Sequence, residues 1–150
     1  MPHHGLGAFQ QGCILCTSAL MGGGMDGGTA IGEERGTFFL HDFAGELAKA
    51  GENRQLGTAL WFENDHVRIF EVRLEPGERG PFHVHDATYF WTVVEPGRGL
   101  QRFADGSFVV RDYGLGETKY LTHSPDDPLV HDLENVGDTT LRFVTVELKH

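Results

Sequence analysis

Two histidines separated by a single residue, His83 and His85, are the residues whose types and spacing best suit chemistry in this chain. On a β-strand, residues i and i+2 face the same side, so both imidazoles would point to one place. Imidazole nitrogens bind divalent metals, and such a pair can form part of a metal site. A third histidine, His131, lies beside a later apolar run. Together the three can close a facial site of three nitrogens.

The elements that must position these histidines are strands. From Thr58 onward, apolar stretches alternate with turn residues, and this pattern predicts strands. The expected ranges are 59–63, 67–75, 88–95, 100–103, 107–111, 119–122, 130–134 and 141–148. Asp105-Gly106 between two short runs predicts a two-residue hairpin, and Pro76-Gly77 predicts a turn before the histidine pair. Short strands at this spacing predict an all-β sandwich or barrel, with a jelly roll as the natural closed form.

The N-terminal part has a different character. One helix is expected over residues 41–51, which Asp42 can cap and Gly51 can end, with Phe43, Leu47 and Ala50 on one face. The first residues are rich in glycine and lack apolar periodicity. We therefore expect a flexible extension over 1–36 and a single barrel domain over 37–150.

Cys13 and Cys16 have the Cys-x-x-Cys spacing. A structural zinc site usually needs four ligands, and His3 and His4 are the nearest residues that could complete one. A thioredoxin-like redox motif would be followed by a βαβ pattern, which this sequence lacks. The simplest interpretation is two reduced thiols in an N-terminal tail.

Composition narrows the class of protein. Charged residues make up 23% of the chain and hydrophobic residues 39%, which disfavours both a wholly disordered and a membrane-embedded protein. The net charge of −10 disfavours nucleic acids and anionic membranes as partners. The sequence has no long apolar run, and the basic start of a signal peptide is missing. We expect a cytoplasmic protein that acts on a small molecule.

Two segments carry a family resemblance. The segment 77–97 resembles the first motif of the cupin superfamily, and the later His131 with Asn135 resembles the end of the second. The similarity extends from about Leu56 to the C-terminus and is closest to small single-domain bacterial cupins, in which a motif like Asn135-Val-Gly-Asp138 leads into the final strand. It implies a double-stranded β-helix, here with a short helical or irregular N-terminal extension. It also implies a metal inside the barrel and, usually, a homodimer.

The chain departs from the family pattern at two places. The first motif usually supplies a glutamate as fourth ligand, but Phe90 or Tyr89 stands there, depending on the spacing used. The Pro-x-Gly before the third histidine is replaced by Asp126 and Pro128. The set His83, His85 and His131 survives, as in some cupin dioxygenases of thiols and diketones. Three neutral ligands leave a divalent cation its full charge, which favours Fe(II), although Mn, Ni and Zn also accept imidazole.

The resemblance and the histidine set together predict a non-haem iron dioxygenase acting on a small polar organic substrate. A metal-dependent lyase or isomerase and a non-catalytic small-molecule-binding protein stay open as alternatives. The candidates for a catalytic acid or base are Tyr89, Asp86 and His123. Asp86 can instead be a solvated turn residue or the acceptor of an imidazole N–H, and His123 a residue of the rim.

Overall fold

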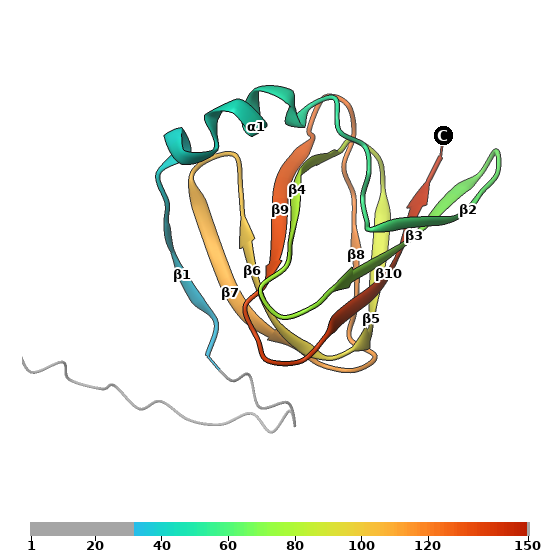
Figure 1. Cartoon of the computed structure of the whole chain (residues 1–150). Helices are drawn as coiled ribbons and strands as arrows, with labels where there is room; N and C mark the ends of the chain where they lie inside the picture. Colours follow the sequence, from blue (N-terminus) through green and yellow to red (C-terminus); the bar gives the residue numbers. More distant parts are fainter. Residues whose placement is uncertain (1–31, 150) are drawn as a thin grey trace, which may run out of the picture.

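Apolar and polar residues alternate between tight turns, and this pattern produces the strands of residues 32–149, the part of the chain that this computed structural model describes (Figure 1). The strands are β1 (Glu34–Thr37), β2 (Ala59–Glu63), β3 (Val67–Leu74), β4 (Arg79–His85), β5 (Tyr89–Glu95), β6 (Gly97–Arg102), β7 (Ser107–Tyr113), β8 (Thr118–Leu121), β9 (Leu129–Asn135) and β10 (Leu141–Leu148). A 3₁₀ turn, η1 (Leu40–Phe43), leads into the helix α1 (Ala44–Ala50).

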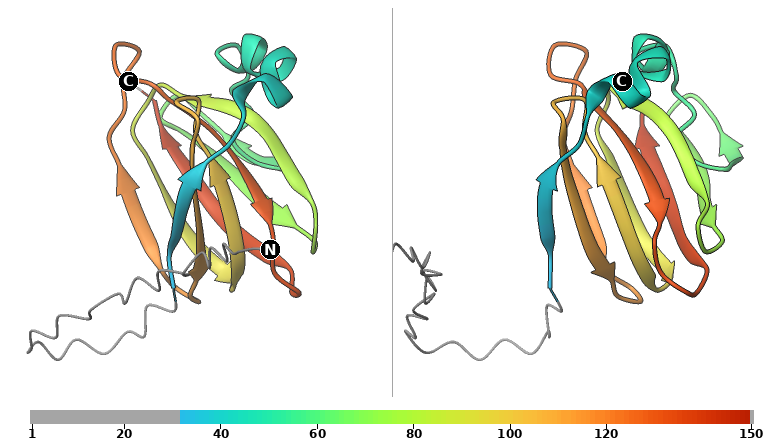
Figure 2. Two further views of the ribbon diagram at one scale, coloured as in Figure 1. Left: turned by 90° about the vertical axis from the view of Figure 1, so that its left-hand side faces the viewer. Right: turned by 60° about the vertical axis from the view of Figure 1, so that its left-hand side comes forward.

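The strands form two antiparallel sheets that face each other (Figure 2). One sheet has the order β1-β7-β6-β9-β4, and the other has the order β2-β3-β10-β5-β8. Sequence neighbours repeatedly lie in opposite sheets, so the chain winds around the barrel as a jelly roll. The all-β, double-stranded β-helix fold expected from the sequence is confirmed.

All eight expected strands are present, and two more join them. β1 pairs with β7 along the edge of the first sheet, so the expected domain start at Thr37 falls on the last residue of this strand. The second additional strand, β4, carries the histidine pair; it was not among the ranges expected from the sequence pattern. A hairpin at Asp105-Gly106 is confirmed, but its loop has three residues, 104–106, and not two, because the N–H of Phe103 donates to the carbonyl oxygen of Ser107. Gly106 closes this loop at a φ of 88° that favours glycine. The two cysteines of the Cys-x-x-Cys spacing, Cys13 and Cys16, lie outside the described residues.

The expected helix is split into η1 and α1, and its proposed cap is wrong. The N-cap of α1 is Phe43, and no side chain caps it. Asp42 lies inside the preceding 3₁₀ turn, where its carboxylate is 3.0 Å from Nε2 of His41. Gly51 ends the helix as expected, with Ala50 buried beneath it.

A buried network of charges fixes α1 to the strands that carry the histidines. Asp132 on β9 is fully buried and accepts hydrogen bonds from Arg79 on β4 and Arg102 on β6. Arg79 also forms a double hydrogen bond with Glu46 of α1, at 3.0 and 2.6 Å. Both guanidinium groups lie 5.2 Å from the ring of Phe43. The helix therefore holds β4 in place from outside the barrel.

An apolar core fills part of the space between the two sheets. Val93, Tyr113, Leu141 and Phe143 form a buried cluster between the two sheets, and Trp91 packs against it. Of the helices in residues 32–149, none has the length and apolar character needed to cross a membrane.

Candidate metal centre

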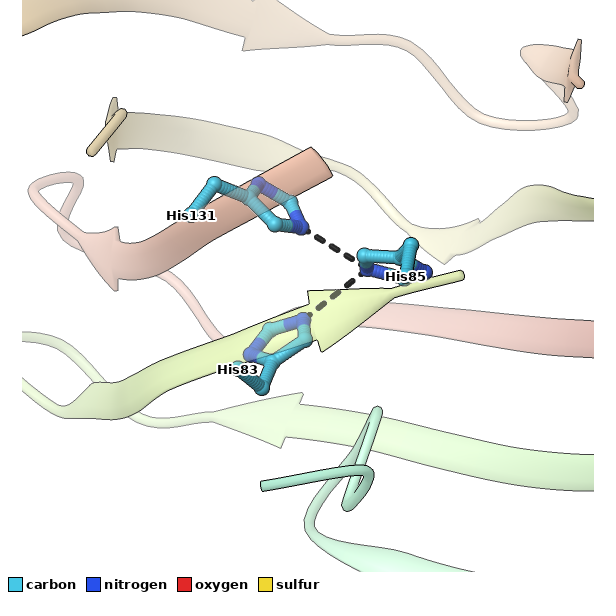
Figure 3. A group of neighbouring side chains, drawn as sticks. All are labelled: His83, His85 and His131. Carbon is cyan, nitrogen blue, oxygen red and sulfur yellow. Dashed lines mark hydrogen bonds between the residues drawn. The ribbon is translucent and has the colours of Figure 1, made fainter. Parts of the chain in front are cut away.

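Strand pairing brings the three histidines together. His83 and His85 alternate along β4 and face the barrel interior, and His131 on β9 is the direct cross-strand partner of His83. The Nε2 atom of His85 lies 3.0 Å from Nε2 of His83 and 2.9 Å from Nε2 of His131 (Figure 3). Within residues 32–149, this is the cluster of histidine, cysteine or acidic side chains that could hold a metal.

All three imidazoles are buried, with exposed fractions of 8% for His83, 2% for His85 and 7% for His131. Burial lowers the pKa of each ring, and for His85 and His131 the pKa falls well below the ordinary value. The neighbouring imidazoles lower the pKa of His85 and His131 further. The three rings are therefore neutral at neutral pH, which is the form that binds a cation.

The imidazoles of His83 and His131 each have a polar contact at Nδ1, the ring nitrogen that faces away from the histidine cluster. The Nδ1–H of His83 donates to the carbonyl oxygen of Pro81 at 3.0 Å, which leaves the lone pair on Nε2. The side-chain nitrogen Nε2 of Gln101 lies 3.3 Å from Nδ1 of His131, and turning the amide by 180° would place its oxygen there as the acceptor of an Nδ1–H. Such contacts behind a ligand fix both its tautomer and the direction of its ring.

His85 is held differently. Its Nδ1 atom is buried and has no hydrogen-bond partner in the described part of the chain. The ring of Tyr89 stacks on it instead, with centroids 3.9 Å apart and planes 19° apart. The orientation of His85 therefore depends on ring packing, because no acceptor aligns it.

The spacing of the nitrogens fits a metal ion. Two nitrogens on perpendicular bonds of about 2.1 Å lie about 3.0 Å apart, whereas tetrahedral bonds of that length separate them by about 3.4 Å. The measured separations of 3.0 and 2.9 Å agree with the first value. Neutral imidazoles at this spacing suit a first-row divalent cation with open positions on the opposite side.

The open side faces a cavity of about 360 Å³ inside the barrel. Its walls include aromatic and aliphatic side chains from both sheets, several uncharged polar groups and two charged residues, Glu78 and Arg79. They are Gln55, Leu56, Gly57, Thr58, Val72, Leu74, Glu78, Arg79, Gly80, Pro81, His83, His85, Tyr89, Trp91, Gln101, Tyr113, His131, Leu133, Phe143 and Thr145. Small-molecule sites commonly have this character, with an apolar lining and few polar groups.

The residues considered for the fourth ligand position point in different directions. Tyr89 is 3% exposed and lines the cavity, whereas Phe90 is not among the lining residues. Burial raises the pKa of the Tyr89 hydroxyl well above its ordinary value, so it stays protonated. Tyr89 can therefore donate a hydrogen bond into the cavity at neutral pH.

The other two catalytic candidates lie away from the cavity lining. The carboxylate of Asp86 accepts hydrogen bonds from Nε and Nη2 of Arg54, at 3.0 and 2.5 Å, and none from an imidazole in the described residues. His123 lies behind Tyr89, with ring centroids 6.1 Å apart, and its Nδ1 is 3.2 Å from the carbonyl oxygen of Asp127. It is half-buried and is not among the residues that line the cavity.

Two residues of the cavity wall were missed by the sequence reasoning. Gln101 lies behind His131, and the side chain of Thr145, which is 4% exposed, lines the cavity. The signal for Thr145 was present, because it alternates with the buried Leu141 and Phe143 along β10. The sequence around Gln101 gives no indication of a contact with His131. The two residues come together only because β6 pairs with β9.

The fold matches solved cupin structures. A cupin domain from Bordetella pertussis Tohama I aligns with 61% of this chain and 91% of its own, at 25% identity and a TM-score of 0.54. An RmlC-like cupin family protein with a double-stranded β-helix fold from Methanocaldococcus jannaschii aligns with 65% of this chain and 86% of its own, at 20% identity and a TM-score of 0.50. No protein-family profile and no curated protein matches the sequence. The structural neighbours support assigning the chain to the cupin superfamily.

Proposed function

We propose that the protein is a metal-dependent cupin enzyme in which His83, His85 and His131 hold a divalent cation, with Fe(II) favoured. The proposal rests on the convergence of three buried, neutral imidazoles at the spacing of metal ligands, on the wall of an internal cavity. When bound, the ion would supply a Lewis-acid centre and, as Fe(II), a site for dioxygen chemistry.

The reaction class that we propose is dioxygenation, in which both atoms of O₂ enter a small organic substrate. A lyase or isomerase normally needs a side chain that moves a proton to or from the substrate. Of the charged residues that line the cavity, Arg79 is engaged with Glu46 and Asp132, and Glu78 accepts from the backbone N–H of Glu75. Dioxygenation at the cation depends less on a proton-transferring side chain in the cavity wall than a lyase or isomerase reaction does.

Tyr89 is the candidate that keeps a chemical role in this proposal. Its hydroxyl is protonated at neutral pH and belongs to the cavity wall, so it can donate to an oxygen atom of a bound substrate. Its ring simultaneously holds His85 in place. We propose that Asp86 and His123 support the rim without touching the substrate.

Metal analysis of the full chain tests the ligand set first. Protein purified without added metal should contain close to one equivalent of a divalent cation, and His131→Ala should contain almost none while keeping its circular dichroism spectrum. His66→Ala is the matched control, because His66 is an exposed histidine at the start of β3. Full metal content in His131→Ala would contradict the ligand set.

Oxygen consumption then tests the reaction. Iron-loaded protein should consume oxygen with at least one class among small thiols, β-diketones and hydroxy or keto acids, and His83→Ala should abolish that consumption. Anaerobic incubation of the same compounds would detect lyase or isomerase activity. Tight binding without turnover under any metal loading would instead support the binding-protein interpretation.

A further inference from the structure

The cavity beyond the histidines limits what kind of molecule can bind there. Its volume of about 360 Å³ lies at the lower end for small-molecule sites, so the ligand is compact. One end of the cavity is formed by the three imidazoles, and the opposite part is formed by core side chains of the barrel. A ligand held by the cation must therefore place the rest of its body against these core residues.

Among the residues that line the cavity, Arg79 is the cation and its charge is balanced by two carboxylates, whereas Glu78 is exposed and its carboxylate has no ion-pair partner in the described chain. The guanidinium group of Arg79 donates to Glu46 and to the fully buried Asp132. The carboxylate of Glu78 accepts from the backbone at 2.9 Å. Glu78 would repel a second carboxylate on the ligand, and away from this exposed residue an unpaired charge of either sign would be costly to bury.

Part of the cavity wall is an aromatic cluster. Trp91, Tyr113 and Phe143 pack edge to face, with ring centroids 5.0 to 5.8 Å apart. All three belong to the cavity lining. Arg111 lies over the ring of Tyr113 at 4.3 Å and is bound to Glu117, and it is not a lining residue. Flat rings gain from offset or edge-to-face contact with such a surface beyond the area they bury.

One polar side chain breaks this apolar surface. Thr145 is 4% exposed, lines the cavity and lies between Phe143 and Glu147 on the inward face of β10. Its hydroxyl makes no hydrogen bond to another described side chain or backbone group. Because Thr145 lines the cavity, its hydroxyl can exchange a hydrogen bond with a ligand there.

We propose that the ligand is a flat, otherwise uncharged ring that carries two neighbouring oxygen donors and a further polar substituent. The oxygen donors reach the cation at the three histidines, the ring lies against Trp91 and Phe143, and the substituent bonds to Thr145. This inference rests on the proposed metal function, and it narrows the small polar organic substrates to aromatic or similarly planar chelators.

Calorimetric titration of the nickel-loaded full chain tests this substrate class without requiring turnover. Tropolone and acetohydroxamate both bind metals as singly charged oxygen chelators, but only tropolone carries a flat ring. After correction for the affinity of each chelator for free nickel, we expect tropolone to bind at least about tenfold more tightly. Oxalate, which brings a second charge, should bind more weakly than tropolone on the same corrected scale.

Two variants separate the ring contact from the metal contact. Trp91→Leu should lower the affinity for tropolone about tenfold and leave the affinity for acetohydroxamate within about twofold of the original. Thr145→Val should weaken 3-hydroxy-4-pyranones with a polar ring substituent relative to the same compounds without it. Nickel content reports for each variant whether the barrel and its ligands are intact.

The failures of the two proposals are distinguishable. Absence of metal uptake, or of binding by all chelators, would overturn the metal function and this inference with it. Equal or tighter corrected binding of acetohydroxamate or oxalate, or unchanged tropolone affinity in a metal-loaded Trp91→Leu protein, would overturn the substrate class alone. If Trp91→Leu takes up no metal, the comparison of the three chelators on the original protein still decides the question.

Discussion

Glu46 offers the sharpest test of how α1 supports the barrel. One oxygen of its carboxylate accepts from the backbone N–H of Phe82 at 2.5 Å and from Arg79 at 3.0 Å, and the other accepts from Arg79 at 2.6 Å. Replacing Glu46 by alanine leaves the N–H of Phe82 without this acceptor and removes one of the two carboxylates that neutralise Arg79. Phe82 directly precedes His83, a proposed metal ligand, so the loss falls on the strand of the candidate metal centre.

The expected cost follows from the two lost interactions. A buried donor left unsatisfied costs about 1–3 kcal/mol. The ion pair with Arg79 is partly exposed, with side-chain exposures of 26% and 30%, so it adds at most about 1 kcal/mol. We therefore expect Glu46→Ala to lower the free energy of unfolding by about 1–4 kcal/mol at pH 7. Glu46→Gln keeps an acceptor for Phe82 and should cost about half as much.

The same substitution predicts a pH dependence. The hydrogen bond from Arg79 is the main cause that lowers the pKa of Glu46 below 4.5, with a smaller contribution from the Phe82 N–H, while burial acts in the opposite direction. A carboxylate with a lowered folded-state pKa stabilises the fold above its unfolded pKa, and this stabilisation is lost as the pH falls through the folded pKa. The difference between the original protein and Glu46→Ala should therefore be constant from pH 7 to about 5 and shrink below about 4.5.

Urea unfolding of the full-length chain measures both effects, with Glu52→Ala as the control. Glu52 is exposed and follows the end of α1. A cost below about 0.5 kcal/mol at pH 7, within the range of ordinary surface substitutions, would refute the reasoning. A cost that is as large at pH 3.5 as at pH 7 would refute the assignment of the effect to the ionised carboxylate.

Three further predictions concern the metal site and the chain ends. Tyr89→Leu should weaken metal binding about tenfold in a competition with a chromophoric chelator, whereas Tyr89→Phe should not, because the ring rather than the hydroxyl holds His85; equal losses would contradict this. Saturating nickel should raise the melting temperature of the original protein but not of His85→Ala, and a rise in both would indicate binding elsewhere. A chain that starts at Gly32 should keep its metal content and a cooperative melting transition, and loss of folding would show that the preceding residues are needed.

Most of the fold could be predicted from the sequence because strands and turns are indicated by local residue patterns. Strand alternation and turn residues predicted eight strands and the Asp105-Gly106 hairpin, and the i, i+2 rule correctly placed His83 and His85 on one face. β1 was not predicted because it is a short edge strand, Glu34–Thr37, with a largely exposed sequence. β1 is a strand because its backbone pairs with β7, and its own residues show no apolar alternation that would have indicated this.

The parts of the site that were not predicted depend on partners far away in the chain. The carboxylate of Asp86 is bound by Arg54, and Gln101 lies behind His131, in both cases through contacts that only the closed barrel creates. The cap that Asp42 was expected to provide was displaced because the chain enters α1 through a 3₁₀ turn. Local propensity cannot decide between such alternatives when tertiary contacts fix the entry to a helix.

The pairing of His83 with His131 has a consequence for the order of events during refolding. These residues are direct partners across β4 and β9, and the four strands β5 to β8 lie between them in the sequence. Contacts of such long sequence separation form late, because closing the intervening loop costs entropy that only the assembled sheets repay. Metal capture would then report the joining of β4 to β9, a step that follows the formation of local hairpins such as β6–β7.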